Sequence, residues 1–168
     1  MKILKWIDDN LEIYLVNFLL ANIAVWVFIQ VVLRYIFSYS LPWSEELVRW
    51  CFVWLIWVVI SYGFKVQKHV AIDFLVNKMP QKVRLIINLI INLIILWCMI
   101  KLAILGTEQI LNPIIAKQNS IVLYWPFTDT HVTMLWLYAS LPVGAFLSSI
   151  RVLQNIYADI KTALVIFK

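Results

Sequence analysis

Long stretches without a formal charge constrain this chain more than any other feature of its sequence. The first, Ile13 to Leu33, is long enough to cross the ~30 Å hydrocarbon core of a membrane as a helix. Three further apolar stretches follow it: Cys51 to Phe64, Leu85 to Ile100, and Val132 to Ile150. Only α-helices and closed β-barrels satisfy their backbone hydrogen bonds in lipid, and these stretches lack the alternation of barrel strands. The sequence therefore predicts an all-α integral membrane protein with four transmembrane helices.

The composition agrees with this class. Of the 168 residues, 64% are hydrophobic and only 14% are charged, and a soluble domain of this size would expose much of that apolar surface. We expect a single membrane domain in which all four spans belong together: approximately 13–34, 46–64, 84–106 and 132–151. Short amphipathic segments are expected at the cytoplasmic membrane surface: interfacial helices near 69–80 and 154–167, and an interfacial turn near 1–10 that leads into the first span.

The basic residues predict the orientation of the spans. If both ends of the chain face the cytoplasm, ten of the 14 Lys and Arg residues lie on the cytoplasmic side: Lys2, Lys5, Lys65, Lys68, Lys78, Lys82, Arg84, Arg151, Lys161 and Lys168. The positive-inside rule therefore favours a cytoplasmic N-terminus and a cytoplasmic C-terminus. The net charge of +5 is explained by contact with the cytoplasmic leaflet of the lipid bilayer, and it does not indicate a nucleic-acid partner.

Few residues in the sequence are suited to catalysis or metal binding. Cys51 and Cys98 have no neighbouring cysteine, which favours buried structural thiols. His69 and His131 are the only histidines, too few for the axial ligands of a two-haem cytochrome. No glycine-rich phosphate loop or clustered carboxylate pair is present. We therefore predict that the chain is not an enzyme and has no cofactor or metal site.

A small transporter that works alone, as a homodimer, is one alternative. Ion-coupled transport requires an ionisable group within the membrane, and no Asp or Glu lies inside the four uncharged stretches. Larger transporters bind substrate at pairs of broken helices, whereas here only Pro142, beside Gly144, could kink a span. These patterns favour a rigid helix bundle without a transport site of its own. An assembly subunit of some other membrane complex is a second alternative.

Two patterns within the spans could form an interface with another subunit. Asn88 and Asn92 are one helical turn apart and project from the same face. Trp50, Trp54 and Trp57 form an aromatic stripe at helical spacing. The amides could equally join the four helices to one another, and the rings could equally face lipid. The sequence leaves these alternatives open.

A charged segment, LPWSEELVRW, lies directly before the second span. Ser44 is a suitable N-cap for a helix that starts at Glu45, and acids in a first turn interact favourably with the helix dipole. Glu45 and Arg49 have the spacing of a local ion pair. Because Arg34 precedes the turn and Glu46 is a second acid, we hypothesise a four-residue ion-pair network that holds spans one and two together on the outer side. A capped helix start with one local pair is the simpler interpretation.

The segment RYIFSYSLPWSEELVRWCFVWL, followed by HVAIDFLVNKMP, resembles the small membrane subunit of tripartite ATP-independent periplasmic (TRAP) transporters. The matching positions are specific in combination: Arg34, Trp43, Glu45, Glu46, Arg49, His69, Asp73 and Ala139 to Pro142. The resemblance covers most of the chain from Arg34 to Arg151 and is strongest to the sialic-acid branch. The segment NSIVLYWPFTDTHVTM, before span four, departs from the short link that is usual in the family.

The resemblance implies a transport system of three parts in a bacterial inner membrane. Its partners would be a soluble periplasmic substrate-binding protein and a large multi-span subunit that performs sodium-coupled, elevator-like symport of an organic acid. Sialic acid is slightly favoured as substrate and C4-dicarboxylates come next. The small multi-pass subunit would form a static scaffold in a heterodimer with the large one, and its outer surface would be a candidate docking site for the binding protein. His69 and Asp73, four residues apart, would form a contact at the cytoplasmic boundary.

Overall fold

Four long helices make up most of the computed structural model, which describes residues 2–66, 80–125, 128 and 130–166. They are α1 (Lys2–Ile36), α2 (Pro42–Val66), α4 (Gln81–Leu111) and α7 (Ser140–Ile166). The apolar segments that are long enough to cross a membrane are Asn10–Ile36, Pro42–Val66, Val83–Leu111 and Leu135–Leu164. The prediction of an all-α membrane protein with four spanning helices is confirmed.

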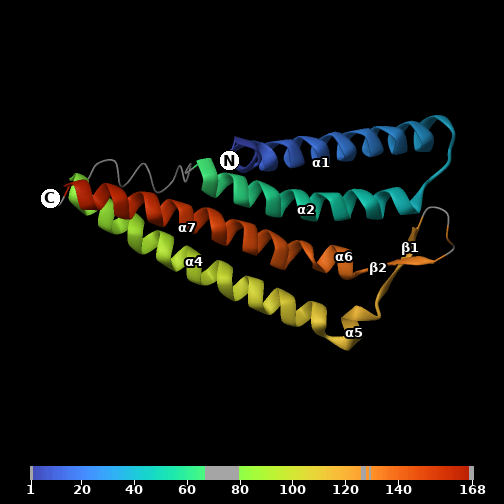
Figure 1. The fold of residues 1–168 in the computed structure, drawn as a ribbon. Helices are drawn as coiled ribbons and strands as arrows, with labels where there is room; N and C mark the ends of the chain where they lie inside the picture. Colours follow the sequence, from blue (N-terminus) through green and yellow to red (C-terminus); the bar gives the residue numbers. More distant parts are fainter. Residues whose placement is uncertain (1, 67–79, 126–127, 129, 167–168) are drawn as a thin grey trace.

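The four helices lie side by side in a single row, in the order α1, α2, α7, α4 (Figure 1). Burial differs between the middle and the edges of the row. In the most apolar windows of α7 and α2, 44% and 28% of residues are buried, against 0% and 6% in those of α1 and α4. The expected bundle is therefore wrong in its arrangement, because the helices form one layer in which α1 and α4 are the two edges.

Small residues on α7 explain why this helix lies inside the row. Ala145 and Ser148 are fully buried. A Cβ atom placed on Gly144 would lie 2.4 Å from the Cβ of Trp57, so the backbone of α7 is in direct contact with a ring-bearing residue of α2. On the α4 side, a Cβ atom on Gly106 would lie 3.2 Å from the backbone nitrogen of Pro142. Small residues allow this close approach of membrane helices, and α7 therefore packs closely against both neighbours.

The apolar core lies near the C-terminal end of α2 and in the middle of α7. Phe64 of α2 and Val152 and Ile156 of α7 are buried together, and Leu96 and Met99 of α4 pack against them. This cluster joins three of the four helices. None of the α1 side chains that the structure describes contributes to it, which is consistent with the position of α1 at the edge of the row.

The ends of the helices differ from the sequence predictions in two ways. The helix α2 begins at Pro42, not at Glu45, and the Ser44 hydroxyl donates to the carbonyl oxygen of Leu41 at 2.9 Å. Proline suits a first helical position because its missing N–H would have no partner there, so the helix starts at Pro42 and Ser44 lies inside its first turn. The segment near 154–167, expected as a surface helix, continues α7 over residues 154–166. The segment near 1–10, expected as an interfacial turn that leads into the first span, is helical from Lys2 as part of α1. Residues 69–79 of the third such segment lie outside the described residues.

Short elements connect α4 to α7. The one-turn helix α5 (Pro113–Ala116) is capped by Asn112, whose side-chain oxygen accepts from the N–H of Ile114 at 3.0 Å. The strands β1 (Asn119–Tyr124) and β2 (His131–Thr133) then pair antiparallel, and α6 (Leu135–Tyr138) leads into α7. No pattern in the sequence predicted this hairpin. It lies beside the start of α2, so this end of the row is covered by chain from outside the spans (Figure 1).

Candidate functional site: two polar clusters that join the helices

A buried carboxylate joins three helices and forms the first polar cluster. Glu12 of α1 is 1% exposed. Its Oε1 accepts hydrogen bonds from the Ser61 hydroxyl of α2 at 2.8 Å and from Arg151 Nε of α7 at 2.7 Å. Its Oε2 lies 3.5 Å from Lys65 Nζ of α2. We call Glu12, Ser61, Lys65 and Arg151 the inner cluster.

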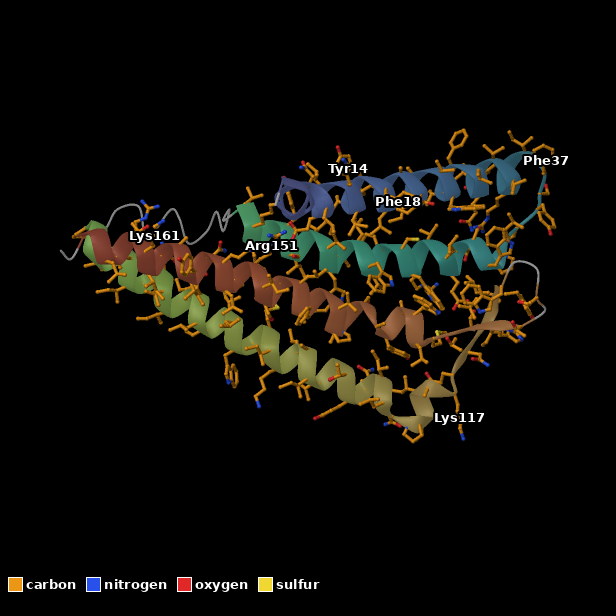
Figure 2. The ribbon with its side chains drawn as sticks, in the orientation of Figure 1. Tyr14, Phe18, Phe37, Lys117, Arg151 and Lys161 are labelled. Carbon is orange, nitrogen blue, oxygen red and sulfur yellow. The ribbon has the colours of Figure 1, made fainter. Side chains whose placement is uncertain are left out.

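Further hydrogen bonds surround the inner cluster. Arg151 Nη1 donates to the side-chain oxygen of Gln154 at 2.8 Å, and the Asn155 amide donates to the backbone oxygen of Phe64 at 2.8 Å. Figure 2 shows Arg151 toward the end of the row where Lys161 lies, away from Phe37 and Lys117. A buried charge is tolerated only when it is paired and hydrogen-bonded, and both charges of the Glu12–Arg151 pair meet this requirement. The cluster is therefore suited to fixing α1, α2 and α7 in place.

Glu12 was not predicted from the sequence as a site residue. It lies directly before the first uncharged stretch, and Arg151 was predicted only as one of the cytoplasmic basic residues. One signal was available in the sequence: Glu12 lies directly before the first apolar stretch, and Arg151 lies directly after the last one. Their pairing could not be predicted because 139 residues separate them.

The outer acids form the second polar cluster. Glu45 Oε1 accepts from Gln30 Nε2 of α1 at 2.6 Å, so it joins α1 to α2. Glu46 Oε2 accepts from the Ser120 hydroxyl of β1 at 2.6 Å, so it joins α2 to the hairpin. We call Gln30, Glu45, Glu46 and Ser120 the outer cluster.

The two arginines of the predicted outer network are placed differently. Arg34 and Glu45 line the same cavity, of about 360 Å³, between α1 and α2. Within the described part of the chain, neither Arg34 nor Arg49 forms an ion pair. The structure thus gives both acids uncharged partners, and the coupling of Arg34 and Arg49 to Glu45 and Glu46 stays a prediction.

The tryptophan stripe of α2 packs within the chain. Trp50 is buried, at 7% exposed. The Trp54 indole N–H donates to the backbone oxygen of Trp136 at 3.0 Å. Trp57 contacts Gly144, as described above. These contacts join α2 to α6 and α7, and an additional contact of the stripe with another subunit stays a prediction.

One of the two asparagines of α4 contacts α7. The Asn92 amide donates to Asp159 Oδ2 at 2.9 Å, so it joins α4 to α7. Asn88, one turn earlier, is half-buried. His69 and Asp73, the predicted boundary contact, lie outside the described residues. Among the residues that are described, no three His, Cys, Asp or Glu side chains come close enough together to hold a metal ion.

Ser120 is predicted to control the position of the hairpin. Its hydroxyl oxygen accepts from the N–H groups of Leu123 at 2.8 Å and Val122 at 3.2 Å while its proton goes to Glu46. Ser120→Ala would leave a carboxylate and two backbone donors without these partners, at a cost of about 1–3 kcal/mol. We expect a lower unfolding temperature and faster hydrogen exchange of the Val122 and Leu123 amides. The matched control is Thr130→Ala, whose exposed hydroxyl bonds, among the described residues, to Thr128 alone, and equal behaviour of the two variants would contradict this role.

Comparison with known proteins places the chain among transporter subunits. The family model described as "Tripartite ATP-independent periplasmic transporters, DctQ component" matches residues 23–162. The chain is 27% identical over 164 residues to the "Sialic acid TRAP transporter small permease protein SiaQ" of Vibrio cholerae, covering 98% of this chain and 90% of that relative. It is also 27% identical over 167 residues to the "C4-dicarboxylate TRAP transporter small permease protein DctQ" of the same organism, covering 87% and 69%.

One relative is much longer than this chain. The "Sialic acid TRAP transporter permease protein SiaT" of Haemophilus influenzae is 30% identical over 164 residues, which cover 96% of this chain but only 23% of that protein. The match to the family model spans both polar clusters except Glu12. On this evidence the chain belongs to the DctQ-component family, the small membrane subunits of TRAP transporters.

Proposed function

We propose that this chain is the static scaffold of a TRAP transporter and supports a large multi-span subunit that carries the substrate. The single row of helices carries this proposal. Unlike a closed bundle, one row does not surround a central path for a substrate. Its charged residues at the inner cluster join helices, and its edge helices expose large apolar side chains, such as Phe28 at 69% and Trp97 at 64%. Such faces can only be covered by lipid or by another membrane protein.

The longer relative supports a large partner. In SiaT of Haemophilus influenzae, the region that matches this chain is covalently joined to a sequence more than three times as long. We infer that this chain associates with a large subunit equivalent to that additional sequence. A stable heterodimer of the two chains is the corresponding assembly.

The names of the relatives support an organic acid as substrate. Two of them are named for sialic acid, and a third for C4-dicarboxylates. We propose sialic acid as the favoured substrate and sodium as the coupling ion. We also propose that the hairpin end of the row faces the periplasm, where it is available to the substrate-binding protein. The chain would lie in the bacterial inner membrane with both ends in the cytoplasm, which puts the inner cluster on the cytoplasmic side.

Co-purification tests the partnership. A tagged copy is purified in mild detergent from its native cell, and we expect one large multi-span protein at equal stoichiometry. In proteoliposomes with the binding protein and a sodium gradient, the two membrane subunits should accumulate sialic acid, and omission of this chain should reduce uptake at least tenfold. Replacing sodium by potassium, and sialic acid by a C4-dicarboxylate, tests the coupling and the substrate. Purification of the chain alone or as a homodimer, or uptake by this chain alone, would contradict the scaffold function.

A further inference from the structure

An apolar cavity of about 640 Å³ lies between the start of α2 and the β1–β2 hairpin. Trp43, Leu47 and Trp50 form the α2 side, and Trp125, Val132 and Trp136 are among the residues on the opposite side. Trp50 and Val132 are each 7% exposed, whereas Trp125 and Trp136 are 45% and 55% exposed. The cavity thus has a buried floor and an open, aromatic rim. Its volume is typical of cavities that bind small molecules, roughly 300–1,000 Å³.

The position of the cavity relates it to the membrane boundary. The spanning segment of α2 begins at Pro42, and Trp50 lies eight residues further along it. At 1.5 Å per residue this is about 12 Å along the helix axis. Because Glu45, Glu46 and Arg49 lie in the same stretch of α2, we place the cavity at the membrane boundary, where the lipid headgroups meet the hydrocarbon. Ligands that reach this space from the bilayer are long, apolar and narrow.

The lining also offers indole N–H donors for which the described residues provide no acceptor. Within the part of the chain that the structure describes, the indole N–H groups of Trp43, Trp50, Trp125 and Trp136 have no acceptor. Trp54 provides the contrast, because its indole N–H donates to a backbone oxygen. An indole N–H can only donate, so its partner must carry an acceptor oxygen. At the boundary of a membrane, tryptophan rings meet such acceptors at the level of the lipid headgroups.

We propose that this cavity binds a phospholipid, with one acyl chain over Trp50 and with ester or phosphate oxygens accepting from the indole groups at the rim. An acyl chain matches the apolar floor, and the ester and phosphate oxygens match the unused donors. A purely apolar side chain from a partner protein would match only the first of these. The site requires a membrane location but does not depend on the scaffold function proposed above.

Lipid binding would have a consequence for the outer surface. The hairpin is held on α2 through the hydrogen bond between Ser120 and Glu46, at 2.6 Å. A bound acyl chain would fill the space beside this contact and add a second connection between the hairpin and α2. The lipid is thus a structural ligand that fixes the shape of the end of the row that the hairpin covers.

A photoreactive lipid can locate the site. The full chain, with whatever subunit co-purifies, is reconstituted with phosphatidylethanolamine that carries a diazirine in one acyl chain, irradiated, and mapped by peptide mass spectrometry. We expect labelling concentrated in 43–50 and 122–136, above the general labelling of the exposed faces of α1 and α4. Leu47→Trp places a further ring in the cavity and should reduce this labelling at least fivefold. Val122→Phe serves as a second filling variant if Leu47→Trp does not fold.

Controls distinguish the cavity from the ordinary lipid shell. Leu20→Trp adds the same ring at a 48% exposed position on α1 and should leave the labelling of 43–50 and 122–136 unchanged. Labelling of α1 is the internal standard for each sample. Even labelling of all exposed segments, or equal labelling in the Leu47 and Leu20 variants, would overturn the proposal. Strong labelling of these segments in the isolated chain but not in its complex would assign the cavity to a protein partner instead.

Discussion

Arg151→Ala is expected to destabilise the chain by about 3–5 kcal/mol, the usual cost of removing one partner of a buried ion pair. The substitution leaves Glu12, which is 1% exposed, with the Ser61 hydroxyl and a more distant Lys65 as its remaining partners within the inner cluster. The buried carboxylate would then lack its closest charged partner, which weakens the contact of α1 with α2 and α7. The free energy of unfolding of a typical domain is about 5–15 kcal/mol, so this loss would remove a large part of it.

Unfolding in mixed detergent micelles measures this effect. The matched control is Arg49→Ala, because Arg49 is exposed and has no ion pair within the described residues, so its loss should change stability by less than about 0.5 kcal/mol. The double variant Glu12→Leu with Arg151→Leu should recover part of the loss, since apolar replacement of both partners removes the unpaired charge. If the Arg151→Ala and Arg49→Ala variants had the same free energy of unfolding, the inner cluster would not be a stabilising contact.

Gly144→Ala is the second substitution with a large expected effect. The added methyl group would lie 2.4 Å from Trp57 Cβ and 2.7 Å from its Cγ, well inside the contact distance of two carbon atoms. Because these atoms belong to the rigid base of the tryptophan, the clash cannot be relieved by moving a flexible side-chain end. The two helices must separate, and overpacking of this kind costs about 1–3 kcal/mol.

A second glycine of the same row provides the control. A Cβ atom on Gly63 of α2 meets nothing within 4 Å. Gly63→Ala should therefore stabilise the helix by roughly 0.5–1 kcal/mol, the ordinary gain for alanine over glycine in a helix interior. The unfolding transitions of the two variants should move in opposite directions. A stable Gly144→Ala protein would mean that α2 and α7 are not in close contact at this point.

The number, type and approximate places of the spanning helices could be predicted because hydrocarbon thickness sets a minimum length for each apolar stretch. Their arrangement could not. Gly144 was recognised in the sequence only as a neighbour of a possible kink, whereas in the structure it is the point where α7 meets Trp57. Glu12 and Arg151 each looked like a boundary charge, because a pair of distant residues leaves no local pattern. The partners of Glu45 and Glu46 were missed for the same reason, since Gln30 and Ser120 are neutral and lie in other elements.

The one-layer arrangement has a mechanical consequence. At interaxial distances of about 8–10 Å, four helices in a row place the axes of α1 and α4 roughly 24–30 Å apart, while the layer is only one helix thick. The same residues folded as a square bundle would reach about half as far across the membrane. Under the proposed scaffold function, a plate of this shape would give the large subunit a long lever arm in the plane of the bilayer, so that torque from its moving domain would be spread over more lipid. Few residues are needed to resist rocking when they are arranged in this way.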